Sequence, residues 1–280
     1  MLLKTFMAVV RSGSFSGAAE ELNSVQSNIT SRIKRLEEHF GQPAFERGRG
    51  GARLNAFGER LKIHAEDLLL RFELAERELM DAAGAHAPLR IGSMETTAAV
   101  RLPGILKMLK QASPMLPISL RTGPTADMIS LLWDRKIDAA FVAGPVDQSR
   151  FESVPAFVEQ LMVARPQSGG EANALLAFRT GCSYRSVAES WLRDQGKSDT
   201  EILEMGTLEG ILGCVDVGMG FAVAPKLAIG SYRGVENLTL SPLPEPFGST
   251  ETLLAWRNDS QITKGLEKLI ETVSLLTNEA

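Results

Sequence analysis

The sequence has few of the residues that build disulfide scaffolds and metal sites. Its 280 residues include two cysteines, Cys182 and Cys214, and three histidines. Two cysteines are too few for a disulfide framework and fit a reducing compartment, so we expect a cytoplasmic protein. The scattered histidines form no obvious metal set, and we expect neither a metal nor another cofactor.

Long apolar runs and common catalytic motifs are also missing. No apolar run approaches the ~20 residues that span a bilayer, so we expect no membrane partner. The first 15 residues pass directly into a patterned helix, which argues against a signal peptide. The sequence contains no P-loop, GxGxxG, GxSxG or HExxH motif, which disfavours an α/β enzyme. We therefore expect a protein that is not an enzyme.

Charge is unevenly distributed along the chain. The formal net charge is −4, yet residues 1–62 carry ten Lys or Arg against six Asp or Glu. Of the chain's 30 basic and 34 acidic residues, 20 and 28 therefore fall in the remainder. A basic N-terminal module on an acidic body is typical of a segment that binds nucleic acid.

Three short helical patterns open the chain. The first ends at Gly13, and the second begins with Ser14 or Ser16 as its N-cap. The third, QSNITSRIKRLEEHFG, follows after a tight connection and ends at Gly41, which predicts a helix-turn-helix. The segment PAFERGRGGARLN then predicts a short β-ribbon with a turn at residues 48–51, and so a winged helix.

The third helix is the candidate recognition helix. With its apolar stripe buried, from Ile29 through Leu36 to Phe40, the other face gathers amide, hydroxyl and basic side chains. Asn and Gln pair with adenine, Arg and Lys with guanine, and hydroxyls with bases or phosphates; an ordinary solvated helix is the alternative. Three arginines of the wing are expected to lie over flanking phosphates or the minor groove. The predicted DNA-binding residues are therefore Gln26, Ser27, Asn28, Thr30, Ser31, Arg32, Lys34, Arg35, Arg47, Arg49 and Arg53.

A long helical pattern without proline follows, from Ala56 to about Ala85. Apolar residues recur there at alternating steps of four and three, as in a heptad seam. A helix of about 28 residues would extend roughly 42 Å. The seam favours a dimer-forming linker helix over a surface helix that lies on its own domain. The predicted dimerisation residues are Leu61, Ala65, Leu68, Phe72, Ala75 and Leu79.

After residues 83–88, short apolar runs alternate with helical patterns. Runs such as LRIGSM, PISLRTG and DAAFVAG are separated by patterns such as TAAVRLPGILKMLKQA and TADMISLLWDRKI. This alternation predicts α/β architecture with largely parallel strands, in one domain or in two lobes.

Six segments, in this order and spacing, resemble the LysR-type transcriptional regulators: FMAVVRSGSFSGAAEEL, QSNITSRIKRLEEHFGQPAFER, GARLNAFGERL, LRIGSMETTAAVRLPGIL, KIDAAFVAGP and GCVDVGMGFAVAP. The resemblance implies an α+β multi-domain protein that binds double-stranded promoter DNA, responds to a small-molecule effector, and assembles as a homotetramer, a dimer of dimers. It implies a winged helix-turn-helix over residues 1–57, a dimerising linker helix over 58–86, and an effector-binding domain over 87–280 similar to periplasmic binding proteins, with lobe I at 87–164 plus 260–280 and lobe II at 165–259.

Several residues depart from the family pattern at the DNA-binding end. Val25 replaces the usual serine at the start of the third helix, so Ser24 would have to cap it. Ser27 stands where proline is usual, Ser31 where arginine is usual, and Asn55 where threonine is usual. We expect these changes to leave the DNA-binding role intact and to bear on individual base contacts.

The effector site is expected between the lobes, at strand ends and helix N-termini. The segment SMETT follows a predicted strand and opens a helix, so its hydroxyls and amides suit an anion, although Glu95 disfavours a strongly anionic one. Thr125 matches a ligand-contacting position of the family. Arg185 would pair with a carboxylate or form a surface ion pair, and each hydroxyl would bind ligand or cap a helix. The predicted effector-binding residues are Ser93, Glu95, Thr96, Thr97, Thr125, Cys182, Ser183, Tyr184, Arg185 and Thr207.

Cys182 supports an alternative function. It falls near the position where peroxide-sensing relatives carry their reactive cysteine, and a helix N-terminus with Arg185 nearby would lower its pKa. The matching resolving position is Trp191, and Cys214 lies in an apolar helical pattern. A thiol-based redox sensor is thus the second hypothesis. A periplasmic solute-binding protein is the third, but it would need an export signal and no basic N-terminal segment.

Overall fold

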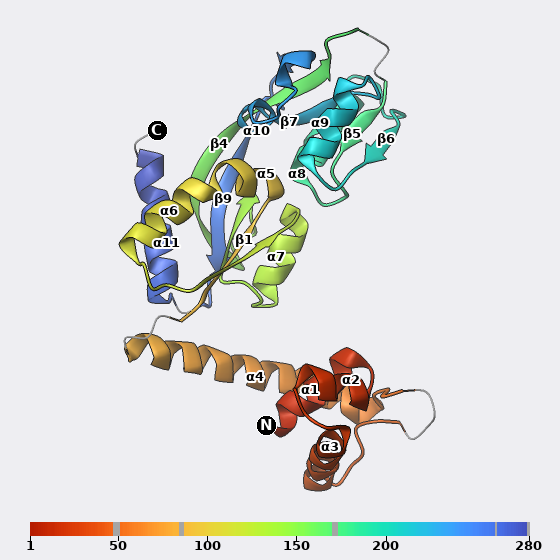
Figure 1. Cartoon of the computed structure of the whole chain (residues 1–280), viewed down its shortest axis with the longest axis vertical. Coiled ribbons are helices and arrows are strands. Elements are labelled where there is room, and N and C mark those ends of the chain that lie inside the picture. The colour runs from red at the N-terminus through yellow and green to blue at the C-terminus, as the bar shows by residue number, and fades with distance from the viewer. Residues whose placement is uncertain (47–50, 84–86, 170–172, 261, 279–280) are drawn as a thin grey trace. The chain divides into compact units, whose positions relative to one another are not determined.

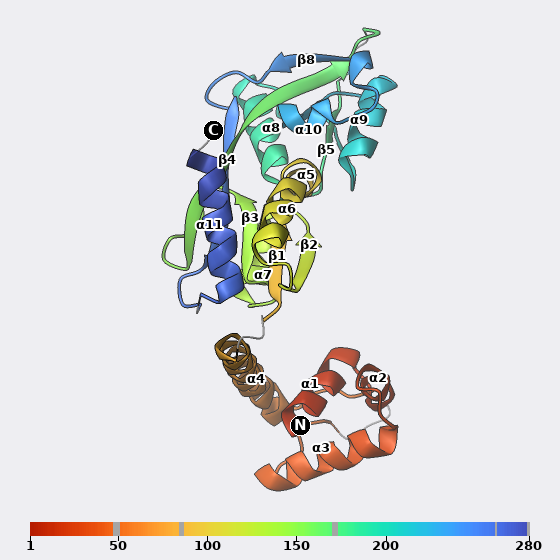
Figure 2. The same cartoon turned by 60° about the vertical axis from the view of Figure 1, so that its left-hand side comes forward.

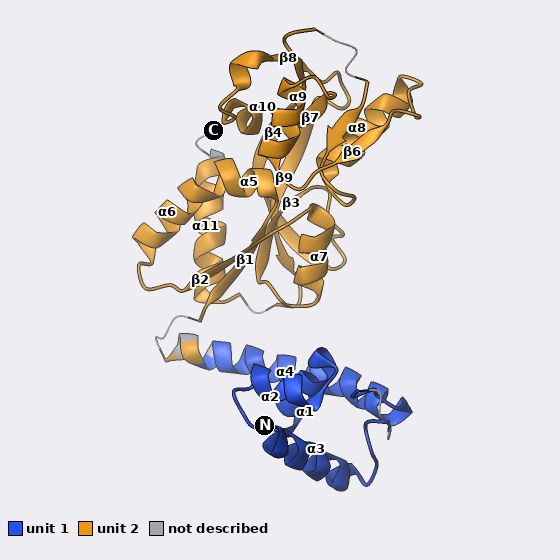
Figure 3. Ribbon diagram, turned by 45° about the vertical axis from the view of Figure 1, so that its right-hand side comes forward, with its two compact units in different colours: residues 1–79 blue, residues 80–280 orange. Residues whose placement is uncertain are grey.

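The chain divides into two units that are described separately below. A computed structural model describes residues 1–46, 51–83, 87–169, 173–260 and 262–278. Figure 1 and Figure 2 show its helices and strands along the chain. Figure 3 shows the two units, residues 1–79 and 80–280. Most of the segment expected as a separate linker, 58–86, therefore belongs with the N-terminal unit.

Unit 1 begins with three short helices whose ends are set by local chemistry. The described helices of this unit are α1 (Leu2–Ser12), α2 (Phe15–Glu21), α3 (Gln26–Phe40) and the long α4 (Ala56–Ala82). Gly13 and Gly41 end α1 and α3 in the left-handed conformation, with φ of 66° and 68°, which glycine adopts without strain. Ser14, one of the two expected caps, begins α2 by accepting a hydrogen bond from the Gly17 amide at 3.0 Å.

The core of unit 1 lies where α1, α2, α3 and the start of α4 meet. Phe6 is completely buried, and its ring centroid lies 5.5 Å from that of Phe45. Phe45 also forms an antiparallel bridge with Leu54, which is the base of the expected wing. The wing tip, which includes Arg47 and Arg49, lies outside the described residues.

The start of α4 packs tightly against the segment that leads into the wing. Asn55 accepts a hydrogen bond from the Gly58 amide at 2.9 Å and donates one from its own side-chain amide to the Pro43 carbonyl at 2.8 Å. It therefore supplies a capping oxygen, as threonine would at this position. A Cβ on Gly58 would lie only 2.0 Å from the Ala44 carbonyl oxygen, so the close approach requires glycine.

Unit 2 is built on a mixed sheet that runs through two lobes (Figure 2). The strands are β1 (Leu89–Ser93), β2 (Ile118–Thr122), β3 (Ala139–Ala143), β4 (Phe151–Pro166), β7 (Ala222–Pro225), β8 (Leu238–Pro242) and β9 (Ser249–Arg257). The strand order is β2-β1-β3-β9-β4-β7, and β8 also pairs with β4. A second, two-stranded sheet contains β5 (Leu175–Ala177) and β6 (Ile202–Glu204).

Helices flank the sheets of both lobes. They are α5 (Glu95–Val100), α6 (Leu102–Ala112), α7 (Thr125–Trp133), α8 (Ser183–Asp194), α9 (Leu208–Asp216), α10 (Lys226–Gly230) and α11 (Lys264–Asn278), with a short 3-10 turn at Val235–Asn237. Each lobe has its own apolar core. Phe141 and Leu254 are fully buried in lobe I, and Leu161 and Leu212 are fully buried in lobe II.

Two expectations about this unit need correction. Pairings β1·β2, β1·β3 and β5·β6 are parallel, but β4 and β9 pair antiparallel with all their neighbours, so "largely parallel" was wrong. β9, which is expected in lobe II, pairs with β3 and packs Leu254 and Trp256 into the lobe I core, and Leu161, which is expected in lobe I, packs into the lobe II core. Alternating strand and helix patterns do not reveal a strand that returns antiparallel from far along the chain.

Candidate DNA-binding surface and effector site

The α3 helix is seated on the core by a stripe shorter than expected. Ile29, Ile33 and Leu36 are each no more than 3% exposed. Phe40, expected to complete the stripe, is 45% exposed, and its ring lies 5.8 Å from that of Phe57. The prediction for Phe40 was wrong because the domain core ends one turn earlier.

The remaining face of α3 is open to solvent and rich in hydrogen-bonding groups. Of the predicted DNA-binding residues on this helix, only Arg32 is half-buried; the exposed ones are Gln26, Ser27, Asn28, Thr30, Ser31, Lys34 and Arg35. Arg53, at the wing base, is exposed as well. Lys34 lies 3.7 Å from Glu38 in an exposed pair, whereas Arg32 and Arg35 form no ion pair with any residue that the structure describes.

The start of α3 differs from the expectation. Val25 is the N-cap and makes no side-chain capping bond, so the prediction that Ser24 caps this helix was wrong. The Ser24 hydroxyl instead accepts a hydrogen bond from the Asn28 side chain at 3.5 Å. Ser16 is a further partner of α3 that the sequence did not indicate, since its hydroxyl was expected only as a cap for α2. Its hydroxyl donates to the Gln26 Oε1 at 3.1 Å.

The apolar stripe of α4 is buried at its start and exposed farther along the helix. Leu61 and Ala65 are buried in the core of unit 1, so these two members of the predicted seam pack within their own chain. Leu68, Phe72 and Leu79 remain 54%, 53% and 68% exposed. Ala75 is exposed between them.

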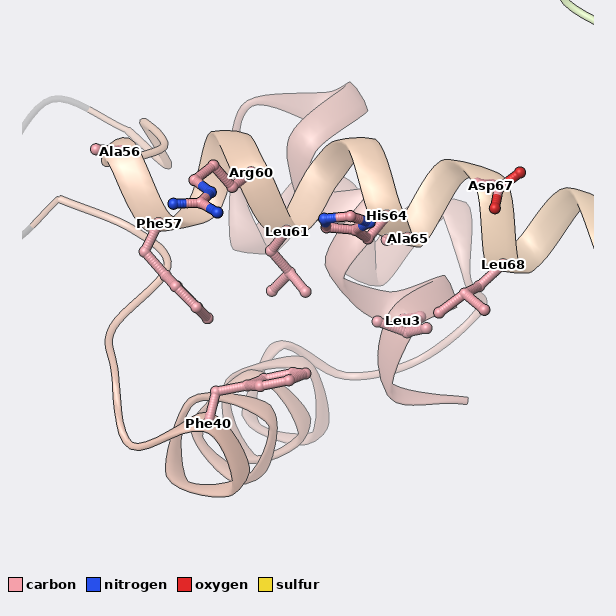
Figure 4. Close-up of a pocket in the computed structure, with 10 residues that line it drawn as sticks. All are labelled: Leu3, Phe40, Ala56, Phe57, Arg60, Leu61, His64, Ala65, Asp67 and Leu68. Atoms are coloured by element: carbon pink, nitrogen blue, oxygen red, sulfur yellow. The ribbon is translucent and has the colours of Figure 1, made fainter.

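An apolar groove lies beside the first half of this stripe (Figure 4). Its volume is about 760 Å³, and α1, α3 and α4 all contribute to its walls. In Figure 4 the side chains of Phe40, Phe57, Leu61 and Leu3 converge on it. The exposure of Phe40 is thus explained by a surface feature that the helical pattern of α3 alone could not reveal.

Several predicted effector residues meet at the junction of the two lobes. Ser93, Thr96 and Thr97, at the end of β1 and in α5, are at most 3% exposed. The Thr96 hydroxyl is hydrogen-bonded to the hydroxyl of Tyr184, on α8 of lobe II, at 3.2 Å. Burial is the main reason that the pKa of Tyr184 is raised, so this hydroxyl stays protonated.

The hydroxyls at this junction differ in their partners. Thr125 Oγ1 accepts from the Ala143 amide at 3.2 Å, and the Ser93 hydroxyl donates to the Met94 carbonyl at 3.0 Å. Thr97 Oγ1 is buried and has no partner among the described residues. Thr207, by contrast, caps α9 by accepting from the Gly210 amide at 3.1 Å, which is the capping alternative considered for it.

Carboxylates already occupy the arginines near the junction. Arg185 forms ion pairs with Glu189 at 2.7 Å and Glu204 at 2.8 Å, and the hydrogen bond to Glu189 is the main cause of its raised pKa. Arg179 of lobe II pairs with Asp127 of lobe I at 2.7 Å. A ligand carboxylate would therefore have to share either guanidinium with a carboxylate that it already binds.

A third arginine, at the α5–α6 junction, is paired in the same way. Arg101 contacts both carboxylate oxygens of Glu159, at 3.0 and 3.3 Å, and its guanidinium lies 4.8 Å from the centre of the Phe157 ring. Glu159 lies on β4 and is 4% exposed, so this ion pair is largely removed from solvent.

Cys182 does not have the environment of a reactive thiol. It is 7% exposed, and burial raises its pKa, outweighing the backbone hydrogen bonds from Arg185 and Tyr184. The expectation of a lowered pKa was therefore wrong. Its neighbour Ser183, also predicted to bind effector, has its hydroxyl 3.9 Å from the Met94 sulfur. In the described part of the chain, no group of His, Cys, Asp and Glu side chains is arranged to hold a metal ion.

The family follows from matches along both units. Residues 1–59 match the model described as "Bacterial regulatory helix-turn-helix protein, lysR family", and residues 82–275 match the "LysR substrate binding domain". The chain therefore belongs to the LysR family and is a transcriptional regulator with a helix-turn-helix and an effector-binding domain. No helix in the described ranges is long and apolar enough to cross a membrane.

Individual relatives agree with this assignment. The chain is 36% identical to the HTH-type transcriptional regulator YofA of Bacillus velezensis, with 99% of this chain and 98% of the relative covered. It is 34% identical to the uncharacterized regulator YusT of Bacillus subtilis, with 96% and 93% covered. A crystal structure of full-length CbnR with its target DNA has the same fold, with a TM-score of 0.70, 20% identity and 98% of each chain covered.

Proposed function

We propose that this regulator reads promoter DNA in the cytoplasm with the exposed face of α3 and with Arg53 of the wing base. The observation that carries the proposal is the contrast between the two faces of α3. Ile29, Ile33 and Leu36 fix the helix on the core, while the amide, hydroxyl and basic groups of the other face have no such role. Side chains of these types read major-groove edges and contact phosphates.

Arg35→Ala is expected to weaken binding to the DNA upstream of the protein's own gene. It should weaken binding to other DNA sequences to the same degree. Arg35 is exposed on α3 and unpaired within the described ranges, which suits a phosphate contact. Loss of one such contact should reduce the slope of the logarithm of the binding constant against the logarithm of the salt concentration by about 0.9 in magnitude. Fluorescence anisotropy across a salt series measures it, with Lys197→Ala on unit 2 as a control that also removes one exposed positive charge. If the unmodified chain shows no salt-sensitive binding to this DNA, the proposal fails.

We further propose that a small molecule bound at the lobe junction controls DNA binding. The support is the buried Thr97 hydroxyl, which lacks a described partner, beside the Thr96–Tyr184 bond that joins the lobes. A buried polar group without a partner is costly, and a ligand would satisfy it. A thermal-shift screen of metabolites should yield a compound that raises the Tm and changes DNA affinity. A set of hits with no effect on DNA affinity would contradict this part.

Self-association through α4 is the third part of the proposal, and a second copy of this chain is the proposed occupant of the groove. The exposed residues Leu68 and Phe72 continue the apolar stripe whose first members line or border the groove. Apolar surface of this kind on a helix is typical of an interface.

Phe72→Glu is expected to weaken the dimer at least about tenfold, because it places a charge at the centre of the proposed interface. Sedimentation velocity over a concentration series measures the dissociation. Ile63→Glu is the matched control, since Ile63 is 66% exposed on the same helix but outside the stripe. Equal weakening by both variants would argue against this interface.

A further inference from the structure

The first residue of the recognition helix is held by two hydroxyl groups. Ser16, exposed on α2, donates its hydroxyl hydrogen to the side-chain carbonyl oxygen of Gln26 at 3.1 Å. Thr30, one turn along α3, donates its hydroxyl hydrogen to the main-chain carbonyl of Gln26 at 3.0 Å. Ser14, not Ser16, caps α2, so the Ser16 hydroxyl has no capping role.

These bonds distinguish the two ends of the Gln26 amide. Its oxygen is engaged by Ser16, while its Nε2 group has no partner among the residues described. A glutamine side chain carries one acceptor and two donors, so the engaged oxygen leaves the donor end free. In the major groove, purine N7, guanine O6 and thymine O4 are acceptors, and the exocyclic amines of adenine and cytosine are donors.

We propose that Ser16 is a positioning residue for base recognition, which orients the Gln26 amide so that it donates to an acceptor on one base pair. The proposal rests on the DNA-binding role of α3. Without Ser16 the amide rotates freely and can present either its oxygen or its nitrogen, so it discriminates less between bases. Thr30 offers an acceptor instead of a donor. Its hydroxyl hydrogen is bonded within the helix, so its hydroxyl oxygen and its methyl group are left to contact DNA.

The test is selection of binding sites from random-sequence DNA by the full chain, followed by sequencing. Gln26→Ala should flatten the base preference at one position of each half-site. Ser16→Ala should reduce the preference at that same position by about three- to tenfold, the worth of one hydrogen bond. The double variant should match Gln26→Ala alone, because the two residues act as one unit. Ser16→Thr keeps the hydroxyl and should retain the preference.

Three results would overturn the inference. The first is that Ser16→Ala selects the same motif as the unmodified chain. The second is that it loses base preference at a different position from Gln26→Ala, and the third is that it binds all sequences more weakly to the same degree. Ser16→Cys, which replaces the hydroxyl by a much weaker thiol donor of similar shape, serves as the second variant if Ser16→Ala fails to fold, and it should reduce the preference at the same position. An unmodified chain that enriches no motif would instead refute the DNA-reading role itself.

Discussion

Gly58→Ala is expected to destabilise unit 1 by about 3 kcal/mol or more and to abolish DNA binding. The new Cβ would lie 2.0 Å from the Ala44 carbonyl oxygen and 2.8 Å from a Leu54 methyl carbon. The first contact is with backbone, which cannot rotate away, so α4 would have to move off the wing base. Thermal unfolding followed by circular dichroism, together with DNA binding, measures both effects.

Gly104→Ala provides the matched control for this substitution. Gly104 also lies within a helix, α6, and a Cβ there would meet nothing within 4 Å. Alanine is favoured over glycine in a helix by roughly 0.5–1 kcal/mol, so this variant should be as stable as the unmodified chain or slightly more stable. If the two variants behaved alike, the close packing at Gly58 would not explain the result.

Arg101→Leu is expected to destabilise unit 2 by about 3–5 kcal/mol. The substitution removes both guanidinium contacts to Glu159, whose side chain is 5% exposed, and leaves a buried carboxylate without its cation. It also removes the contact with the Phe157 ring. Urea unfolding of the full-length variant, compared with that of the full-length unmodified chain, gives the loss in the free energy of unfolding.

The double variant Arg101→Leu/Glu159→Leu separates the cost of an orphaned charge from the cost of lost packing. Replacing a buried ion pair with apolar residues of similar size is often neutral or stabilising, so most of the loss should be recovered. A double variant as unstable as Arg101→Leu would show that the guanidinium acts mainly through packing. In that case the ion pair would contribute little.

Local chemistry explains why the N-terminal part could be predicted from sequence. Gly13, Ser14 and Gly41 set helix ends through interactions with residues a few positions away, and the period of Ile29, Ile33 and Leu36 fixes the buried face of α3. Such signals are complete within a window of one helix. The predicted helix-turn-helix and the predicted exposed face of α3 therefore agree with the structure.

The predictions from sequence were wrong where contacts between segments far apart in the chain decide the structure. The place of β9 depends on pairing with β3, more than 100 residues earlier in the sequence, which no local pattern records. The pKa of Cys182 depends on burial in the lobe II core, which outweighs the effect expected of a helix start. For the effector site, the sequence predicted that Thr96 and Tyr184 both belong to the site. Their direct hydrogen bond could be recognised only from the structure.

The two strands that connect the lobes are paired with each other, and this limits how the lobes can move. β4 and β9 are paired antiparallel from Phe151 and Arg257 at one end to Gln160 and Ser249 at the other, with one register shift on the way. A relative rotation of the lobes is therefore torsion of a single hydrogen-bonded ribbon, in which neither connection can yield alone. The register shift between Pro155 and Phe157 interrupts the ladder within this ribbon, and such a bulge bends the strand and increases its local twist. Under the proposal that an effector binds at the lobe junction, its binding would change the twist of this ribbon.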